Sequence, residues 1–195
     1  MTSMLATAAR GFLCLQILVI GVAIGAEDPR KVPDPTPPPL GTASFVPPAN
    51  LDEQPLNSQS FVVQAALINM AEVEIGTLAQ KNSANADVRR FGAQLVKDHR
   101  DSFTKLKNIA AEAKIALPAE LDPEHQMLRD ELNKLDGPAF DAKFANAMVN
   151  GHEKAIGLFK LAGSSEKLTP ALRSYATSTL PTLQQHAQTA HQLHK

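Results

Sequence analysis

The chain has 195 residues, with 19 basic and 20 acidic residues, six histidines and a formal net charge of −1. No basic patch favours nucleic acid, and the lack of tryptophan with a single tyrosine leaves little surface for stacking on bases or sugars. The sequence also lacks a Ser-His-Asp order, a glycine-rich phosphate loop and a cysteine pair. We therefore expect no nucleic-acid partner, and no enzyme class is indicated.

Residues 1–26 are typical of a secretory signal peptide. Arg10 supplies positive charge, and the apolar run GFLCLQILVIGVAIGA ends in the small residues Gly25 and Ala26. Because a membrane-spanning helix needs about 20 apolar residues, we expect cleavage rather than a permanent anchor. An uncleaved anchor is the alternative, and it would be the only expected contact with a membrane. The predicted location is the periplasm or cell envelope. The sequence does not identify a protein partner there.

Cleavage would also remove Cys14, the only cysteine, and with it any disulfide or thiolate chemistry. Residues 27–57 are predicted to be a proline-rich, disordered tether, since nine prolines between Glu27 and Pro55 exclude a helix or a central strand. The alternative is an ordered arm that packs on the domain through a few apolar side chains: Leu40, Phe45, Val46 and Leu51.

Residues 58–195 are predicted to form one helical domain. Apolar residues recur at helical spacing, and turn or capping residues divide them into four long helices and one short helix. The expected boundaries are Ser58 or Ser60 to about Asn82, Asn85 or Asp87 to about Lys114, a short helix opened by Pro123, a third long helix that follows a break at Asp136-Gly137-Pro138 and runs to about Ala162, and a fourth from about Thr169. The predicted fold is all-α: an up-and-down four-helix bundle with a short inserted helix.

Each long helix carries one potential metal ligand within its apolar face. These residues are Glu72, His99, His152 and His186. Residues at this spacing share one side of a helix, and in a bundle that side faces inward. A polar group buried without a partner costs about 1 to 3 kcal/mol. We therefore expect these four groups to pair with one another or with an ion.

Distances along the helices predict which of these groups share a layer. Glu72 and His99 lie about 18 and 22 Å from the turn between their helices, at 1.5 Å per residue. His152 and His186 lie about 18 and 30 Å from theirs, a poorer match. Pro181, one turn before His186, either kinks the last helix and shifts this position or breaks the helix. Three groups in one layer are expected, and His186 depends on Pro181.

Imidazole and carboxylate ligands suit zinc, iron or copper, and bundle cores often hold such sites. A di-iron centre needs Glu-x-x-His motifs, but the residues three before the histidines are Val96, Val149 and Leu183. The residues therefore predict at most a mononuclear site with one divalent transition-metal ion. Met148, one turn before His152, would extend a copper site or simply pack in the core.

The alternative to a metal site is a buried polar network. In that network Glu72 accepts hydrogen bonds from the histidines, and Ser102 and Thr179 supply further partners. Inward-facing histidines commonly have such a structural role.

Several sequence blocks carry a family resemblance. The run AAxxxMAEVEIGTLAQKNSANADVRRFGAQLVKDH is followed by GPAFDAKFANAMVNGHEKAIGLF and LPTLQQH. Across Ser58 to Leu193 the chain resembles the ferritin-like bacterial family catalogued as domain of unknown function 4142, often labelled predicted outer membrane protein. The resemblance implies a ferritin-like four-helix core in an exported protein, but no activity. It places five residues at the family's polar positions: Glu72, His99, Asp141, His152 and His186.

Three functional hypotheses follow. The first is an exported envelope or stress-related binding protein without catalysis. The second is a mononuclear protein for zinc, copper or iron that uses the His/Glu cluster. The third is a domain that spaces or assembles on partner helices, which predicts a long exposed apolar face.

Overall fold

The computed structural model describes residues 54–194, which contain five helices and no strand. The helices are α1 (Ser58–Asn82), α2 (Ala86–Glu112), α3 (Pro123–Asn133), α4 (Gly137–Ser164) and α5 (Pro170–Leu193). The predicted all-helical fold with one short inserted helix is therefore confirmed. The predicted signal segment and residues 27–53 of the predicted tether lie outside the described residues.

The helix boundaries follow from capping residues in the sequence. Asn57 begins α1 with a capping box to Ser60, and Asn85 begins α2 by accepting a hydrogen bond from the backbone N–H of Asp87. Asp122 caps α3, with Pro123 in its first turn, and Thr169 caps α5. The predicted starts differ from these by only a residue or two, except that the cap of α1 is Asn57 rather than a serine.

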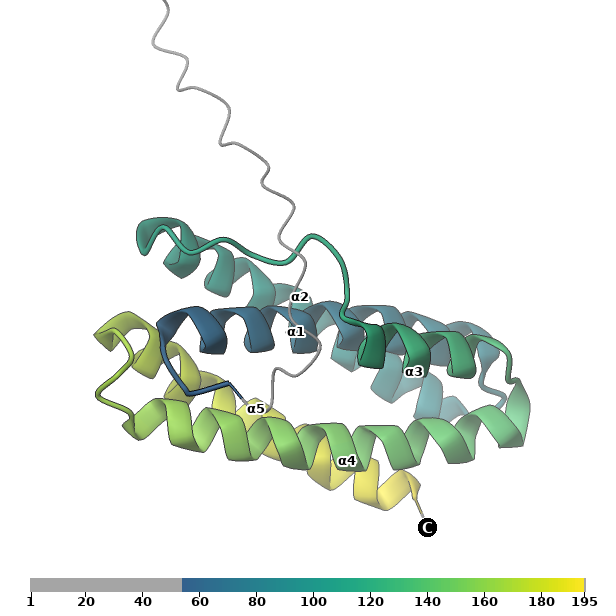
Figure 1. The fold of residues 1–195 in the computed structure, drawn as a ribbon. Helices are drawn as coiled ribbons and strands as arrows, with labels where there is room; N and C mark the ends of the chain where they lie inside the picture. The colour runs from purple at the N-terminus through teal and green to yellow at the C-terminus, as the bar shows by residue number, and fades with distance from the viewer. Residues whose placement is uncertain (1–53, 195) are drawn as a thin grey trace, which may run out of the picture. The chain divides into compact units, whose positions relative to one another are not determined.

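The four long helices form two hairpins, α1 with α2 and α4 with α5 (Figure 1). The chain then crosses the length of the bundle between α2 and α4, so that α4 begins at the end where α1 stops. The side-chain amide of Asn82 fixes this arrangement by donating to the carbonyl oxygen of Leu135 at 3.1 Å. Helices α2 and α4 therefore run in the same direction. The predicted up-and-down alternation is wrong at this connection, because the loop and α3 together are long enough to return the chain.

The buried side chains form two apolar clusters along the bundle. One contains Phe61, Leu106, Phe159 and Leu172, and the other contains Leu67, Leu95, Phe144 and Met148, among other residues. Along α2, α4 and α5 the chain passes from one cluster to the other at a histidine. The polar layer therefore lies where the two clusters meet. Helix α1 is apolar and long enough to resemble a membrane span, but its residues contribute to both clusters.

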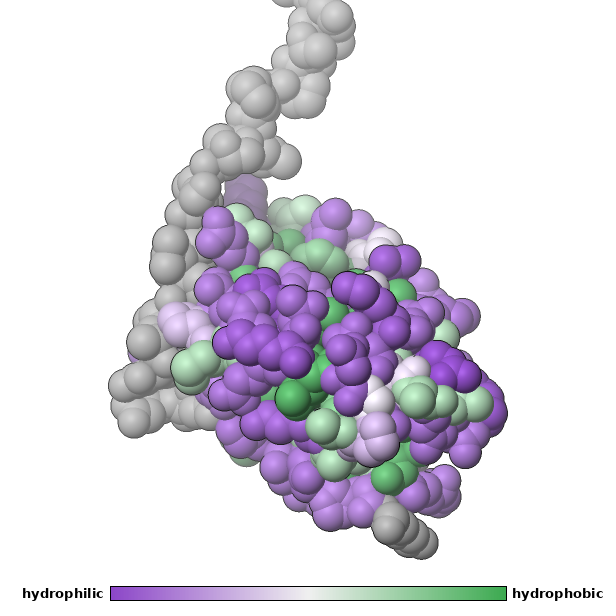
Figure 2. All heavy atoms as spheres, turned by 90° about the vertical axis from the view of Figure 1, so that its right-hand side faces the viewer, coloured by the Kyte–Doolittle hydropathy of each residue, from purple (hydrophilic) through white to green (hydrophobic). Residues whose placement is uncertain are grey.

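No long apolar face is exposed among residues 54–194. The only large hydrophobic side chains classed as exposed there are Met127 and Leu161, at 64% and 59%. Figure 2, which looks at the bundle end containing the α1–α2 turn and the start of α4, shows a largely hydrophilic surface with scattered apolar areas. This distribution counts against the hypothesis of assembly on partner helices.

Helices α1 and α2 approach closely at a pair of glycines. A Cβ added to Gly92 would lie 2.7 Å from the carbonyl oxygen of Gly76, and the reverse substitution would create the same contact. We expect Gly92→Ala to lower the free energy of unfolding by about 1 to 3 kcal/mol, because the helices must move apart. Urea denaturation measures this change. Gly157→Ala is the control, since its Cβ would meet no other described atom within 4 Å. This substitution should stabilise the helix by up to about 1 kcal/mol. Equal effects at both positions would contradict the close-packing explanation.

Candidate metal centre

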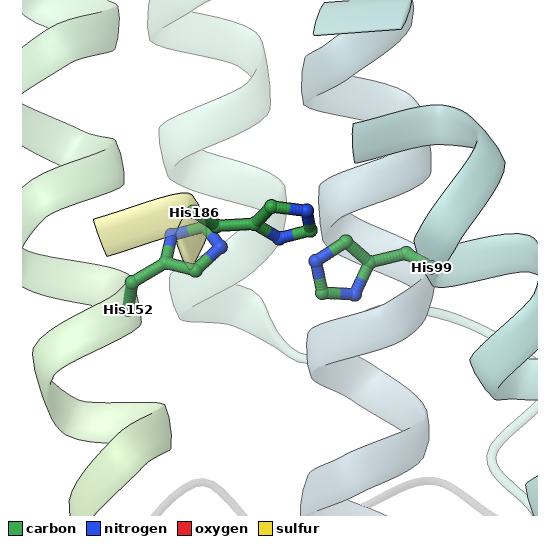
Figure 3. Close-up of side chains that lie close together, drawn as sticks. All are labelled: His99, His152 and His186. Atoms are coloured by element: carbon green, nitrogen blue, oxygen red, sulfur yellow. The ribbon is translucent and has the colours of Figure 1, made fainter. Parts of the chain in front are cut away.

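Three of the predicted polar residues meet inside the bundle. His99 comes from α2, His152 from α4 and His186 from α5, and one ring nitrogen of each lies within 4.8 Å of the other two. The ring centroids are 5.3 to 5.9 Å apart, and Figure 3 shows the rings clustered around a shared space. All three residues are at most 3% exposed. Since metal–nitrogen bonds are about 2.0 to 2.1 Å long, an ion would have to draw the rings together slightly.

His186 reaches this cluster because α5 continues through Pro181 as one helix. The alternative that Pro181 splits the last helix is therefore wrong. Polar side chains near the proline bond to the helix backbone: the hydroxyls of Ser178 and Thr179 donate to the carbonyl oxygen of Tyr175 at 3.1 and 2.8 Å. The hydroxyl of Thr179 therefore bonds to the helix backbone and not to a histidine.

The surroundings of His99 determine which of its nitrogens carries the proton. Its Nδ1 lies 3.0 Å from Oδ1 of Asn69, which is itself 2% exposed. The orientation of that amide is fixed, since its Nδ2 donates to the carbonyl oxygen of Ala65 at 2.7 Å and to the hydroxyl of Tyr175 at 3.1 Å. Because Oδ1 can only accept, Nδ1 of His99 must donate. The lone pair of the neutral ring is then on Nε2.

The other two histidines are fixed in the same way. His152 donates from Nδ1 to the carbonyl oxygen of Met148 at 2.8 Å, and His186 donates from Nε2 to Oδ2 of Asp98 at 3.0 Å. Each partner is an acceptor, so in the neutral rings the opposite nitrogens hold lone pairs. A hydrogen bond on one nitrogen that leaves the other free to coordinate is the usual arrangement of metal-binding histidines.

The three remaining nitrogens have no hydrogen-bond partner among residues 54–194. They are Nε2 of His99, Nε2 of His152 and Nδ1 of His186. Burial, with the nearby charges that His152 and His186 would carry, holds the pKa of His99 well below its ordinary value of 6.5. Burial and His152 also lower the pKa of His186 from 6.5, although Asp98 acts to raise it. The lowered pKa values favour the neutral form of both rings, which offers a lone pair.

Asp98 connects the cluster to the surface between α2 and α5. Its side chain is 18% exposed and accepts hydrogen bonds from both Gln94 and His186. Partial burial acts to raise the pKa of Asp98, but these hydrogen bonds and the attraction to His186 and Lys97 lower it below 3.8 overall. An ionised carboxylate behind an imidazole increases the basicity of the nitrogen on the other side of the ring.

Glu72 lies beside the histidine cluster but outside it. Its Oε1 is 3.9 Å from Nδ1 of His152, the nitrogen that already donates to Met148. Its Oε2 is buried without a hydrogen-bond partner among the described residues. Burial raises the pKa of Glu72 above 4.5, although His152 and His125 act to lower it. The structure thus places Glu72 behind the ring of His152 rather than among the converging nitrogens.

Comparison with known families identifies the chain. The model of the family described as Domain of unknown function (DUF4142) matches residues 44–193. The chain belongs to the DUF4142 family. The match begins fourteen residues before the predicted start of the bundle at residue 58, within the segment predicted to be a tether. No curated protein matches this DUF4142 chain.

Two solved structures are similar to the DUF4142 chain. One is CopM in its Cu(II)-bound form, with a TM-score of 0.60 and 16% sequence identity, over 72% of this chain and 97% of that one. The other is a predicted secreted protein, DUF305, from Streptomyces coelicolor, with a TM-score of 0.59 and 11% identity, over 68% and 87% of the two chains. At these identities the likeness concerns the helical fold alone.

Other residues singled out in the DUF4142 sequence do not join the histidines. Asp141 precedes His152 by eleven residues in α4, about 16 Å along the helix axis, and its Oδ1 is buried with no hydrogen-bond partner in the described part of the chain. Met148 lies in the apolar core and offers the cluster only its carbonyl oxygen, which accepts from His152. Ser102 bonds to the hydroxyl of Tyr175 at 2.7 Å instead of to a histidine.

Two residues of this DUF4142 site were missed in the sequence. Asn69 lies one turn before Glu72, and Asp98 directly precedes His99 in a run of mixed charges that is typical of a solvated surface. Nothing in a single sequence distinguishes Asp98 from its charged neighbours. Asn69 had a weak signal, because an amide within an otherwise apolar helix must find a buried partner.

Proposed function

We propose that this DUF4142 protein binds one divalent transition-metal ion through Nε2 of His99, Nε2 of His152 and Nδ1 of His186. The observation that carries the proposal is the convergence of three buried imidazole nitrogens whose opposite nitrogens donate to fixed acceptors. In the neutral rings, none of the three inward nitrogens can donate to another. An ion supplies the missing partner for all three at once.

The polar-network alternative accounts less well for these contacts. In it, Glu72 accepts hydrogen bonds from the histidines, yet its nearest histidine contact is 3.9 Å long, to a nitrogen that donates to Met148. A buried acceptor without a donor costs about 1 to 3 kcal/mol, so three of them would be a considerable penalty for a merely structural layer.

The ligand chemistry limits the choice of ion. Three neutral imidazoles suit zinc, copper(II) or iron(II), and three protein ligands leave a further coordination position free for water or another ligand. CopM, a structural neighbour, was solved in a Cu(II)-bound form, which makes Cu(II) the first ion to test. The single crossover between two helical hairpins is shared by ferritin-like bundles, and we assign the chain to that architecture.

The proposed role is to hold the ion rather than to catalyse a reaction. The signal-like segment and the proline-rich stretch after it support export to the periplasm or cell envelope. The protein would thus be an exported binding protein whose ligand is the metal ion held at the mononuclear site.

Elemental analysis of protein purified without a histidine tag tests the proposal. After incubation with Cu(II) or Zn(II) and removal of excess metal, the parent protein is expected to retain about one ion per chain. His99→Ala and His152→Ala should each retain less than a tenth of that amount, because two imidazoles remain. His191→Ala is the matched control, since His191 lies on α5 but is exposed and bonds to Glu153 at 3.1 Å. Less than a tenth of an ion per parent chain would refute the proposal.

A further inference from the structure

A groove of about 640 Å³ runs along the side of the bundle between α1 and α4, with α3 at its edge. Its apolar part includes Leu67, Ala71, Ile75 and Met148. Glu72 also lines it, although this residue is only 7% exposed. The groove thus leads from the surface to a buried carboxylate that lies 3.9 Å from Nδ1 of His152.

The charges along the groove favour a cation. Four carboxylates line it, from Glu72, Asp122, Glu124 and Glu153, against Lys143, Lys154 and the imidazole of His125. Asp122 contacts His125 at 2.6 Å, and Glu153 contacts His191 at 3.1 Å. Both lysines are already paired with glutamates of α3: Lys143 with Glu131 at 2.7 Å and Lys154 with Glu124 at 3.5 Å. The buried Oε2 of Glu72 has no partner among the described residues, so a cation in the groove would meet an uncompensated acceptor at its inner end.

Gly151 leaves the approach to Glu72 open. It lies on α4, lines the groove and is exposed, and a Cβ built on it would be 3.7 Å from Oε1 of Glu72. A single methyl group fits at this distance, whereas a larger side chain would extend over the carboxylate. Gly157, on the same helix, is also exposed but does not line the groove, and its Cβ would meet no atom of the described residues within 4 Å.

We propose that this groove is the route by which a divalent cation reaches the three histidines, with Glu72 as the last carboxylate it meets before His152. The inference rests on the proposed function, since it concerns how the same site is filled. The histidines are at most 3% exposed, so an ion cannot reach them without a path through the side chains. His152 lies between Glu72 and the other two rings, and rotation of its ring, with loss of the Met148 contact, passes the ion inward.

The rate of metal uptake tests this route. Metal-free protein is mixed with Zn(II) in a stopped-flow instrument, and the decrease of free Zn(II) is followed with a fluorescent indicator. The substitutions Gly151→Ala, Gly151→Val and Gly151→Leu should slow uptake progressively, at least tenfold for leucine, while the final stoichiometry stays at the parent value. Gly157→Leu, the matched control, should load at the parent rate.

Glu72→Gln gives an independent test, because it keeps the shape of the side chain and removes the charge. We expect uptake and release to slow together, several-fold, with the equilibrium affinity unchanged. A lower affinity with an unchanged uptake rate would make Glu72 a ligand and overturn the route.

Three further outcomes would also overturn it. They are parent-like uptake in Gly151→Leu, equal slowing in Gly157→Leu, and loss of the final stoichiometry in the Gly151 series. Failure of the metal proposal itself is distinguishable, since the parent protein would then take up no metal at any rate.

Discussion

A saturating divalent ion is expected to raise the unfolding temperature of the parent protein, and His152→Leu is expected to abolish this gain. At a free-ion concentration one hundred times Kd, a single site adds about 2.7 kcal/mol to the free energy of unfolding. For a domain of this size, that corresponds to an increase of about 5 to 10 °C in Tm. Differential scanning calorimetry with and without the ion measures it. His191→Ala should keep the full gain.

The same variant separates a metal ligand from a structural histidine. In metal-free buffer, His152→Leu should change the free energy of unfolding by less than about 1 kcal/mol. Leucine removes the Nε2 that has no hydrogen-bond partner within residues 54–194, and the carbonyl oxygen of Met148 keeps its place in the backbone hydrogen bonds of α4. A loss of about 3 kcal/mol or more without metal would instead indicate a structural polar network, and would contradict the proposed role.

Acid should destabilise the metal-free domain below pH 6.5. The pKa values of His99 and His186 are lowered from 6.5 in the folded protein, so between those values and 6.5 the unfolded chain binds more protons. Stability therefore rises with pH through this window and falls as the pH drops, by at most about 1.4 kcal/mol per pH unit for each histidine. Because coordination needs the neutral rings, bound metal should also be released as the pH falls.

Glu72 has the opposite effect on the pH dependence of stability. Its pKa is raised above 4.5, so its contribution to stability is complete below 4.5 and is lost as the pH rises through the folded value. Glu72→Gln should therefore steepen the dependence of stability on pH between 4.5 and 6.5. Urea denaturation at several pH values in the presence of a chelator measures both slopes. A parent slope of zero with an unchanged slope in the variant would show that these groups do not titrate differently on folding.

The sequence predicted the helices well because their start signals are local. Asn85, Asp122 and Thr169 cap helices through their own side chains, and each is followed within a few residues by apolar periodicity. The direction of α4 was not predictable in this way. It depends on the path of residues 113–136, and the contact that fixes it joins Asn82 to Leu135 across 53 positions in the sequence.

The candidate site was predictable in part. The spacing of His99, His152 and His186 marked them as inward-facing, and the structure does bury them together. Axial distances favoured Glu72 as a partner of His99, whereas the structure places it beside His152. Positions along the helix axis do not show on which side of an imidazole ring a neighbouring side chain lies. The predicted distance of His186 from the turn between the last two helices was also too large, because α5 begins at Pro170, only sixteen residues before His186.

The distribution of the three histidines between the hairpins has a consequence for local unfolding. His99 belongs to the α1–α2 hairpin, while His152 and His186 belong to the α4–α5 hairpin. Both apolar clusters join the two hairpins, but helix contacts are more extensive within each hairpin than between them. Units of this kind can open separately. An ion held by both would require them to open together. Amide hydrogen exchange should then change from two protection levels, one for each hairpin, to a single shared level when metal is bound.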